Sequence, residues 1–275
     1  MNFDYQINLN RDNEWHMQRH HFHEDYEILL SLSDAGNMFV GRDLYSLKRG
    51  TLLLLNDNVL HRSFSTTAVL YERYVLHFSQ ETLAAISTSQ TNLLSEFNTA
   101  NQCIELNENE LLSLATLFER CCQPKSNVFG DDLRRNIAFI ELLLKVCTLF
   151  SNKDTIDSRQ TPQVVDFDRV APILEYIQSN LMKELNLDSI AEHFFMSKYH
   201  LCHIFKSSTG FSVREYIIHS RVLKARTLLR NGYSVQTAGE QAGFQNNAHF
   251  IRTFKKLSGM SPGHYKKEYL NKIKQ

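Results

Sequence analysis

The sequence predicts a two-domain α+β protein, with a β-barrel or jelly roll and trailing helices in the N-terminal domain and an all-α C-terminal domain. Three observations carry this prediction. The 275 residues exceed the usual size of one domain. Short segments of alternating polarity occupy 21–78, and a repeated pair of helical segments occupies the last third of the chain. We expect domains over 1–155 and 168–275, joined by a polar linker over 156–167.

The N-terminal strands are expected where apolar and polar residues alternate between turn sequences such as Asp34-Ala35-Gly36. The expected strands are Glu27–Leu32, Met38–Val40, Leu44–Leu47, Thr51–Asn56 and Tyr71–Phe78. Strands this short are typical of a small barrel or jelly roll. Helices are expected over 81–97 and 104–151, with two apolar stripes that must be buried against the barrel or against a second copy of the chain. The stripes are Leu111, Leu114, Ala115 and Phe118, and then Ile137, Ile140, Leu144 and Cys147.

The composition is that of an ordinary globular protein, with 43% hydrophobic and 22% charged residues. The N-terminal residues lack a basic segment followed by an apolar one, and the longest apolar runs are too short to cross a membrane. The five cysteines are scattered and form no CxxC pair, which argues against a disulfide framework and a zinc site. We therefore expect a cytoplasmic protein with reduced thiols, no membrane association and no cofactor.

The net charge of zero hides an uneven distribution of charge. Residues 172–275 contain 15 Lys and Arg against 7 Asp and Glu, whereas residues 1–171 contain 15 against 23. The C-terminal domain thus has the excess of cations that a module binding a polyanion needs, because neutralising phosphates releases counterions.

The basic region contains an internal repeat. Residues 201–206 recur as 250–255 at an offset of 49, and upstream residues 187–192 match 235–240 at an offset of 48. The second copy therefore has one residue more in its turn. Each copy is interpreted as a helix-turn-helix unit of two short helices, and a continuous helical pattern from Val213 to Arg230 connects the two units.

Capping residues define these helices. Asp188 or Ser189 is expected to cap the first helix of the first unit, and Ser197 the second. In the second unit Ser234 is expected to cap the first helix, and Gly243 occupies a turn position that requires a small residue. Both second helices carry basic outer faces over apolar inner faces, which indicates contact with DNA.

Several residues of the repeat resemble the AraC/XylS family of transcription regulators over about residues 168–270. They are Met196-Ser197-Lys198-Tyr199-His200-Leu201, Phe205-Lys206, Gly210, Tyr216, Ala242-Gly243-Phe244, Phe250, Phe254-Lys255-Lys256, Gly259, Ser261-Pro262 and Tyr265. The resemblance implies a seven-helix domain on double-stranded promoter DNA and an N-terminal domain that senses a small molecule. It also implies a homodimer through helices in 104–151, and RNA polymerase as a partner if the protein is an activator.

By position, the resemblance also implies which residues contact DNA. They are Tyr199, Cys202, His203 and Lys206 in the first unit, and Asn247, Ala248, His249, Arg252 and Lys255 in the second. Asn247 can pair bidentately with adenine and Arg252 with guanine, whereas Ala248 offers only an apolar contact such as one with a thymine methyl.

One feature departs from the family pattern. The first helix of the second unit usually has a large aliphatic residue followed by alanine, but here Ala238-Gly239 stand there. A glycine within a helix costs on the order of 1 kcal/mol relative to alanine, and the missing aliphatic side chain removes buried area. We therefore predict a second unit that is looser than the first.

The N-terminal segment resembles two cupin motifs through His21, His23, Glu27 and the later His61. In metal-binding cupins the matching positions hold one divalent ion, and alternation within a strand would point His21 and His23 to the same side. Sensor domains of the regulator family share this HxH pattern and mostly carry no metal. Three interpretations stay open: a metal site, a metal-free ligand pocket, and structural histidines near the barrel mouth.

The expected effector site combines these four residues with aromatic neighbours. Its members are His21, His23, Tyr26, Glu27, Tyr45, His61 and Tyr74. A polar and aromatic lining suits a small hydroxylated ligand, and family analogy makes a sugar or sugar derivative the leading candidate. The alternative from another class is a metal-dependent cupin enzyme using His21, His23, Glu27 and His61, which leaves the C-terminal repeat unexplained. Sequence motifs for other catalysis, such as a P-loop or a nucleophile elbow, are absent.

Overall fold

The computed structural model divides the chain into two compact units, residues 1–163 and 164–275, which are described separately. The residues described are 3–12, 25–34, 36–57, 59–64, 70–98, 102–124, 126, 128–155 and 167–273. The expected linker over 156–167 lies outside them except for Phe167.

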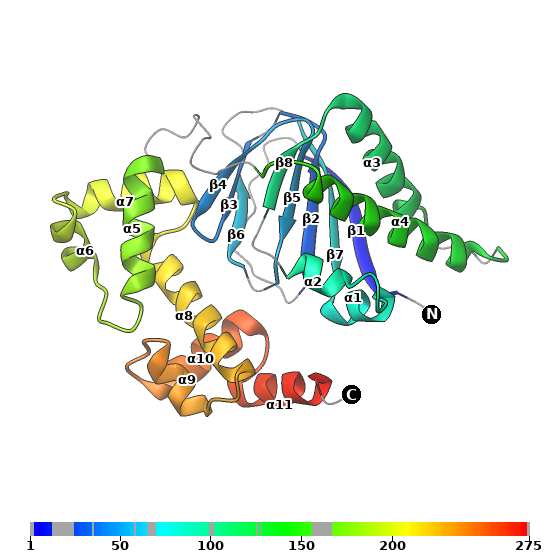
Figure 1. The fold of residues 1–275 in the computed structure, drawn as a ribbon. Helices are drawn as coiled ribbons and strands as arrows, with labels where there is room; N and C mark the ends of the chain where they lie inside the picture. The colour runs from blue at the N-terminus through cyan, green and yellow to red at the C-terminus, as the bar shows by residue number, and fades with distance from the viewer. Residues whose placement is uncertain are drawn as a thin grey trace. The chain divides into compact units, whose positions relative to one another are not determined.

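Two antiparallel sheets form the N-terminal unit (Figure 1). The five-stranded sheet has the order β1 (Tyr5–Asp12), β7 (Tyr71–Phe78), β2 (Tyr26–Ser31), β5 (Thr51–Leu55) and β8 (Gln102–Glu105). The three-stranded sheet has the order β4 (Asp43–Leu47), β3 (Gly36–Val40) and β6 (His61–Phe64). All five expected strands are present, with ends that differ by at most two residues. Strands β1, β6 and β8 were not expected, and β8 extends into a range expected to be helical.

Alternation along the strands gives the five-stranded sheet two apolar faces. Residues such as Leu29 and Leu53 pack toward Met38 and Val40 of the smaller sheet. Their neighbours, such as Ile28, pack on the opposite side against helices. A residue shifted by one position along a strand therefore belongs to a different layer of the molecule.

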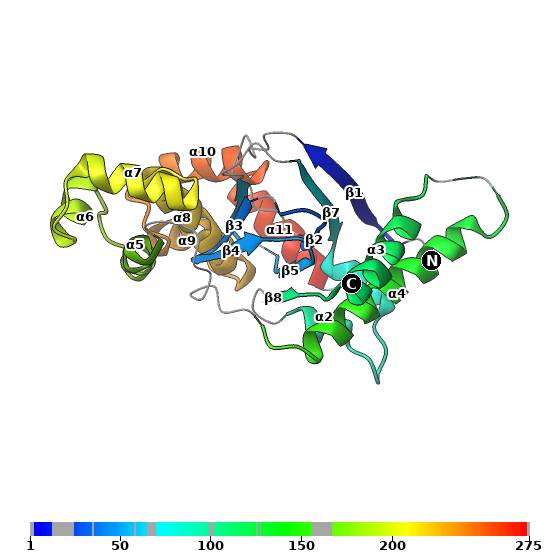
Figure 2. The same cartoon turned by 90° about the horizontal axis from the view of Figure 1, so that it is seen from above.

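Four helices complete the N-terminal unit: α1 (Gln80–Ile86), α2 (Leu93–Phe97), α3 (Glu108–Cys122) and α4 (Asp131–Ser151). A capping box between Asn107 and Glu110 begins α3. The stripe of α3 containing Leu111 and Phe118 is buried, as expected. Helix α4 instead buries the face of Phe139 and Leu142, so that part of its predicted stripe, including Ile137, stays exposed. Figure 2 shows α3 and α4 side by side.

All the regular secondary structure among the described residues of the C-terminal unit is helical. Its helices are α5 (Phe167–Ser179), α6 (Leu187–His193), α7 (Lys198–Thr209), α8 (Val213–Arg230), α9 (Val235–Gln241), α10 (Asn247–Ser258) and α11 (Pro262–Ile273). Ser197 caps α7 and Ser234 caps α9, as expected, and α8 has the predicted bounds. The cap of α6 is Asn186, not Asp188 or Ser189, because the Asn186 side chain accepts a hydrogen bond from the Ser189 amide at 2.8 Å.

Gly239 has a physical role in α9. A Cβ atom at this position would lie 2.7 Å from Cδ1 of Phe250, a distance that real side chains do not tolerate. The glycine thus lets the Phe250 ring pack directly against the α9 backbone, where it is fully buried. Ala238, which stands where the family pattern has a larger aliphatic residue, is fully buried. The looser second helix-turn-helix unit stays a prediction. None of the helices in the described part of the chain is both long and apolar enough to span a membrane.

Candidate nucleic-acid interface and ligand-binding site

Helix α7 has one buried and one exposed face. Leu201, Ile204 and Phe205 are buried in the C-terminal unit. Tyr199 is 82% exposed, and its ring stacks on that of His203 with centroids 6.4 Å apart. The DNA-contact residues predicted for this helix are Tyr199, Cys202, His203 and Lys206, of which Cys202 is half-buried and the others are exposed. The structure therefore brings all four together around the outer surface of one helix.

Helix α10 repeats this arrangement with a more basic surface. Phe250 and Phe254 anchor it, since both rings are fully buried. The predicted contact residues are all exposed: Asn247, Ala248, His249, Arg252 and Lys255. Asn246 caps the helix by accepting a hydrogen bond from the His249 amide at 2.9 Å. The helix itself contains Arg252, Lys255 and Lys256 and no acidic residue.

Charge distinguishes the two faces. On α7, Lys198 forms an ion pair with Asp188 of α6 at 2.5 Å, so part of its charge is compensated within the protein. Lys206 and His203 remain on the outer face. Because α10 carries three cations, it presents the stronger attraction for phosphate.

The N-terminal unit buries a polar cluster centred on Glu27. Oε2 of Glu27 lies 3.0 Å from Nε2 of His77 and 3.3 Å from Nε2 of His61. The Glu27 side chain is 4% exposed and that of His61 is 1% exposed. The three residues come from β2, β7 and β6, on both sheets. A buried carboxylate requires such partners, because leaving it isolated in an apolar interior is costly.

Two further polar side chains lie on the same face of β7 as His77. The guanidinium of Arg73 sits 4.1 Å from the centre of the Tyr71 ring and donates to Asp12 at 3.2 Å. Burial raises the pKa of the Tyr71 hydroxyl above its ordinary value, so this group stays neutral at physiological pH. Tyr45 belongs to the same apolar layer between the sheets.

The structure separates the expected effector residues into two layers. Glu27, Tyr45 and His61 lie between the sheets, whereas Tyr26 and Tyr74 belong to the cluster on the helix-covered side. The Tyr26 hydroxyl donates to Asn98, and the Tyr74 ring stacks on Phe118 with centroids 5.1 Å apart. Tyr26 and Tyr74 are therefore not brought together with the Glu27 cluster. His21 and His23 lie outside the described residues.

The seven expected effector residues include neither Arg73 nor His77. The signal was the alternation of β7, where residues 71, 73, 75 and 77 share a face. The β2–β7 register then places His77 opposite Glu27. Among the described residues, His, Cys, Asp and Glu side chains form no group of three or more with the geometry of a metal site.

Two family models match this chain. Residues 8–143 match the AraC-like ligand binding domain, and residues 190–268 match a helix-turn-helix domain. The chain belongs to the AraC/XylS family. It is a DNA-binding transcription regulator with a ligand-binding domain, and the enzyme alternative is rejected on this ground.

Some relatives match this regulator along most of its length. It is 26% identical over 254 residues to the uncharacterized regulator YfiF of Bacillus subtilis, covering 90% of this chain and 79% of that one. It is 25% identical over 247 residues to the transcriptional activator RhaS of Escherichia coli, covering 88% and 85%. The structure of ToxT from Vibrio cholerae aligns over 95% of this chain and 97% of that one, at 15% identity and a TM-score of 0.38.

Proposed function

We propose that this regulator recognises promoter DNA by placing α7 and α10 in successive major-groove segments. The observation that carries the proposal is the pair of exposed, cationic helix faces, each held by fully buried apolar side chains on its inner side. Helix α8 connects the two helix-turn-helix units within the C-terminal unit and sets the separation of α7 and α10 (Figure 1). Successive major-groove segments on one face of DNA lie about 34 Å apart.

Within these faces, we assign different tasks to different side chains. Arg252 and Asn247 can form bidentate hydrogen bonds with guanine and adenine, so they would read sequence. Lys206 and Lys255 would contact phosphates and contribute affinity without specificity. A promoter target would also place the working protein with the chromosome in the cytoplasm, and with RNA polymerase where the outcome is activation.

Fluorescence anisotropy tests this proposal. The full chain is titrated onto labelled DNA from upstream of its own and neighbouring genes, at several salt concentrations. We expect tight binding to one fragment with a steep salt dependence. Arg252→Ala should weaken specific binding about 5- to 150-fold, whereas Arg214→Ala, an exposed change on α8, should have little effect. Binding that is insensitive to salt, or equal losses in both variants, would contradict the proposal.

The effector would bind between the two sheets, beside the Glu27 cluster. Glu27, His61 and Tyr45 supply hydrogen-bonding groups there, next to His77, Arg73 and Tyr71 of β7. Such an arrangement suits a hydroxylated molecule, and a sugar or sugar derivative is our leading candidate. His21 and His23 are proposed as further contacts from the preceding segment. Bound ligand would shift an existing equilibrium between arrangements that differ in their affinity for DNA.

The two layers of the N-terminal unit provide a matched test of this site. A panel of monosaccharides is screened by thermal unfolding of the full chain, and the best ligand is then titrated into variants. Tyr45→Phe and Glu27→Gln should weaken its binding, whereas Tyr74→Phe should not, because Tyr74 faces the helices. A loss of affinity in Tyr74→Phe equal to that in Tyr45→Phe would place the ligand elsewhere.

A second copy of the chain is the proposed partner of α4. Leu133, Ile137 and Leu144 are 59%, 53% and 42% exposed, and their spacing of four and seven residues forms one stripe. Apolar side chains gathered on one exposed stripe favour association. We expect Ile137→Glu to shift the protein from dimer to monomer in analytical ultracentrifugation. Met182→Glu, at an equally exposed apolar residue in the C-terminal unit, should leave the dimer intact. A monomeric wild-type protein would refute this partner.

A further inference from the structure

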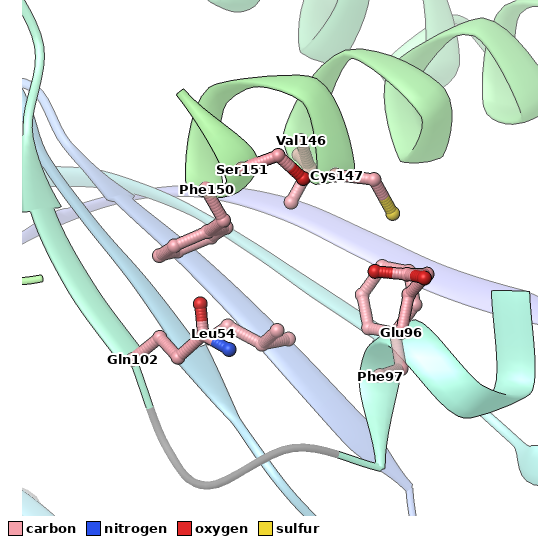
Figure 3. A pocket seen from close by; sticks show the side chains of 8 residues that line it. All are labelled: Leu54, Glu96, Phe97, Gln102, Val146, Cys147, Phe150 and Ser151. Carbon is pink, nitrogen blue, oxygen red and sulfur yellow. The ribbon is translucent and has the colours of Figure 1, made fainter. Parts of the chain in front are cut away.

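A cavity lies in the N-terminal unit, on the helix-covered side of the five-stranded sheet (Figure 3). Its volume is about 190 Å³. Helix α4 forms one wall, strands β5 and β8 form the opposite wall, and α2 closes one end. The lining residues are Leu54, Glu96, Phe97, Gln102, Val146, Cys147, Phe150 and Ser151. Leu54 belongs to the helix-facing cluster, so the sheet separates this cavity from the Glu27 cluster.

The lining combines apolar walls with one charged group. Leu54, Val146 and Phe150 supply aliphatic and aromatic surface, and Gln102 and Ser151 supply polar groups at the rim. Glu96 is the charged member of the eight lining residues, and its side chain is directed toward Cys147 of α4 in Figure 3. The electrostatic balance of the described lining is therefore negative.

Two further observations show that the cavity has a negative electrostatic potential. Burial raises the pKa of the Cys147 thiol to about 11, and the nearby Glu96 carboxylate contributes to the increase. The carboxylate charge thus acts within the cavity, while the thiol stays protonated and neutral. In addition, α4 ends at Ser151, so the partial negative charge of its C-terminus lies at the cavity rim. Both effects favour a cation over an anion.

The volume limits the size of the ligand. An apolar cavity of about 150 Å³ holds a benzene molecule in another protein. A cavity of about 190 Å³ therefore has room for one six-membered ring with a short substituent. The Phe150 ring and the aliphatic walls would contact the ring of the ligand, and the ammonium group would face Glu96.

We propose that this cavity is a second ligand site that binds a small aralkylamine, a single aromatic ring carrying a protonated amine on a short chain. The site is independent of the sugar site between the sheets. Because Val146 and Cys147 line it while Ile137 and Leu144 of the same helix form the exposed stripe, a bound amine would contact the inner side of α4.

Isothermal titration calorimetry on the full chain at neutral pH tests the ligand class with three probes of similar size. These are benzylamine, benzyl alcohol and benzoate, which differ in the charge of the substituent. We expect benzylamine to bind about fivefold more tightly than benzyl alcohol, and benzoate to bind most weakly. Absence of benzylamine binding at about 10 mM, or equal affinity for benzylamine and benzyl alcohol, would overturn the proposal.

Three variants assign this binding to the cavity. Glu96→Gln should equalise the affinities for benzylamine and benzyl alcohol, because it removes the charge and keeps the shape. Glu119→Gln, an exposed carboxylate on α3, should retain the fivefold preference. Cys147→Phe should fill the cavity and abolish binding of both probes, with its fold checked by circular dichroism. Because Glu96 is exposed, Glu96→Gln should fold normally, and a preference that survives in it would overturn the proposal even if Cys147→Phe fails to fold.

Discussion

The two helix-turn-helix units have the same order of helices but pack different side chains between them. At equivalent positions, the first unit has Ala191 and Leu201, whereas the second has Gly239 and Phe250. In the second helix-turn-helix unit the smaller Gly239 on α9 is thus combined with the larger Phe250 on α10. The contact of 2.7 Å that a Cβ at Gly239 would make with Phe250 shows that the two choices depend on each other. The summed volume of this one pair is thus nearly kept while its distribution changes, which cores tolerate well.

The turns of the two units differ more sharply. Phe195 and Gly243 occupy equivalent positions with positive φ angles of 53° and 95°. Phe195 is 99% exposed. Gly243 is buried, and a Cβ there would lie 2.0 Å from the carbonyl oxygen of Leu181 and 2.9 Å from Nε of Arg221. The second turn therefore packs closely against the α5–α6 loop and α8, while the first turn faces solvent. The same backbone geometry tolerates phenylalanine in one place and requires glycine in the other.

The largest predicted effect is at Gly243. Gly243→Ala should destabilise the C-terminal unit by at least about 3 kcal/mol, because the added methyl group meets a backbone carbonyl that cannot move away freely. Urea unfolding of the full chain followed by circular dichroism measures the loss, with the transition of the C-terminal unit fitted separately.

Gly232→Ala is the matched control for this prediction. Gly232 also has a positive φ, of 87°, but among the described residues no heavy atom lies within 4 Å of a Cβ built there. Gly232→Ala should therefore lower the free energy of unfolding by only about 1–2 kcal/mol, which is the cost of placing a residue with a Cβ in the left-handed region. Equal losses at Gly232 and Gly243 would mean that the close approach to Leu181 contributes nothing.

An intermediate effect is expected at Gly239. Gly239→Ala should cost about 1–3 kcal/mol through overpacking against Phe250, despite a gain of about 1 kcal/mol in helix propensity. In a Phe250→Leu background the same change should become neutral or stabilising, because the pair then matches Ala191 and Leu201 of the first unit. A double-mutant cycle from urea unfolding gives the coupling. If Gly239→Ala changes the free energy of unfolding equally in the wild-type and Phe250→Leu backgrounds, the sizes of residues 239 and 250 are not coupled.

The same comparison shows which parts of the fold were predictable from sequence. The helices of both helix-turn-helix units could be located from the sequence. Capping residues such as Ser197 and Ser234 stand directly before segments whose apolar residues recur at helical spacing. In the N-terminal unit the predicted strands include all those in sheet interiors, and the unexpected β1, β6 and β8 are all edge strands. Edge position alone does not explain this, because β4 is an edge strand that was expected, and Tyr5-Gln6-Ile7-Asn8-Leu9-Asn10 of β1 alternates in polarity. What distinguishes β1 is its low burial. In Tyr5–Asp12 every residue is at least partly exposed.

The functional sites were predictable to different degrees. The residues predicted to contact DNA lie on single helices, where spacing alone determines the face, and they lie on the outer sides of α7 and α10, with Cys202 half-buried. The proposed effector site depends on strand pairing. Tyr26 and Glu27 are adjacent, so they could not share a face, and that signal was available in the sequence. Excluding Tyr74 required the β2–β7 register, which only the folded sheet determines. The cavity under α4 joins segments from α2, β8 and α4, and no local pattern indicates it.

The smallest predicted effect is at the turn of the first unit, and its sign is opposite to that at Gly243. A non-glycine residue in the left-handed region costs about 1–2 kcal/mol, and glycine loses about 0.5–1 kcal/mol more backbone entropy on folding. Phe195→Gly should therefore stabilise the C-terminal unit by about 0.5–1 kcal/mol, since the exposed ring contributes no burial. Phe195→Ala keeps the Cβ and should change stability by less than about 0.5 kcal/mol. If urea unfolding shows that both variants lower stability, the Phe195 ring has a packing role in the first unit that its exposure does not reveal, and the two turns are less different than their surroundings indicate.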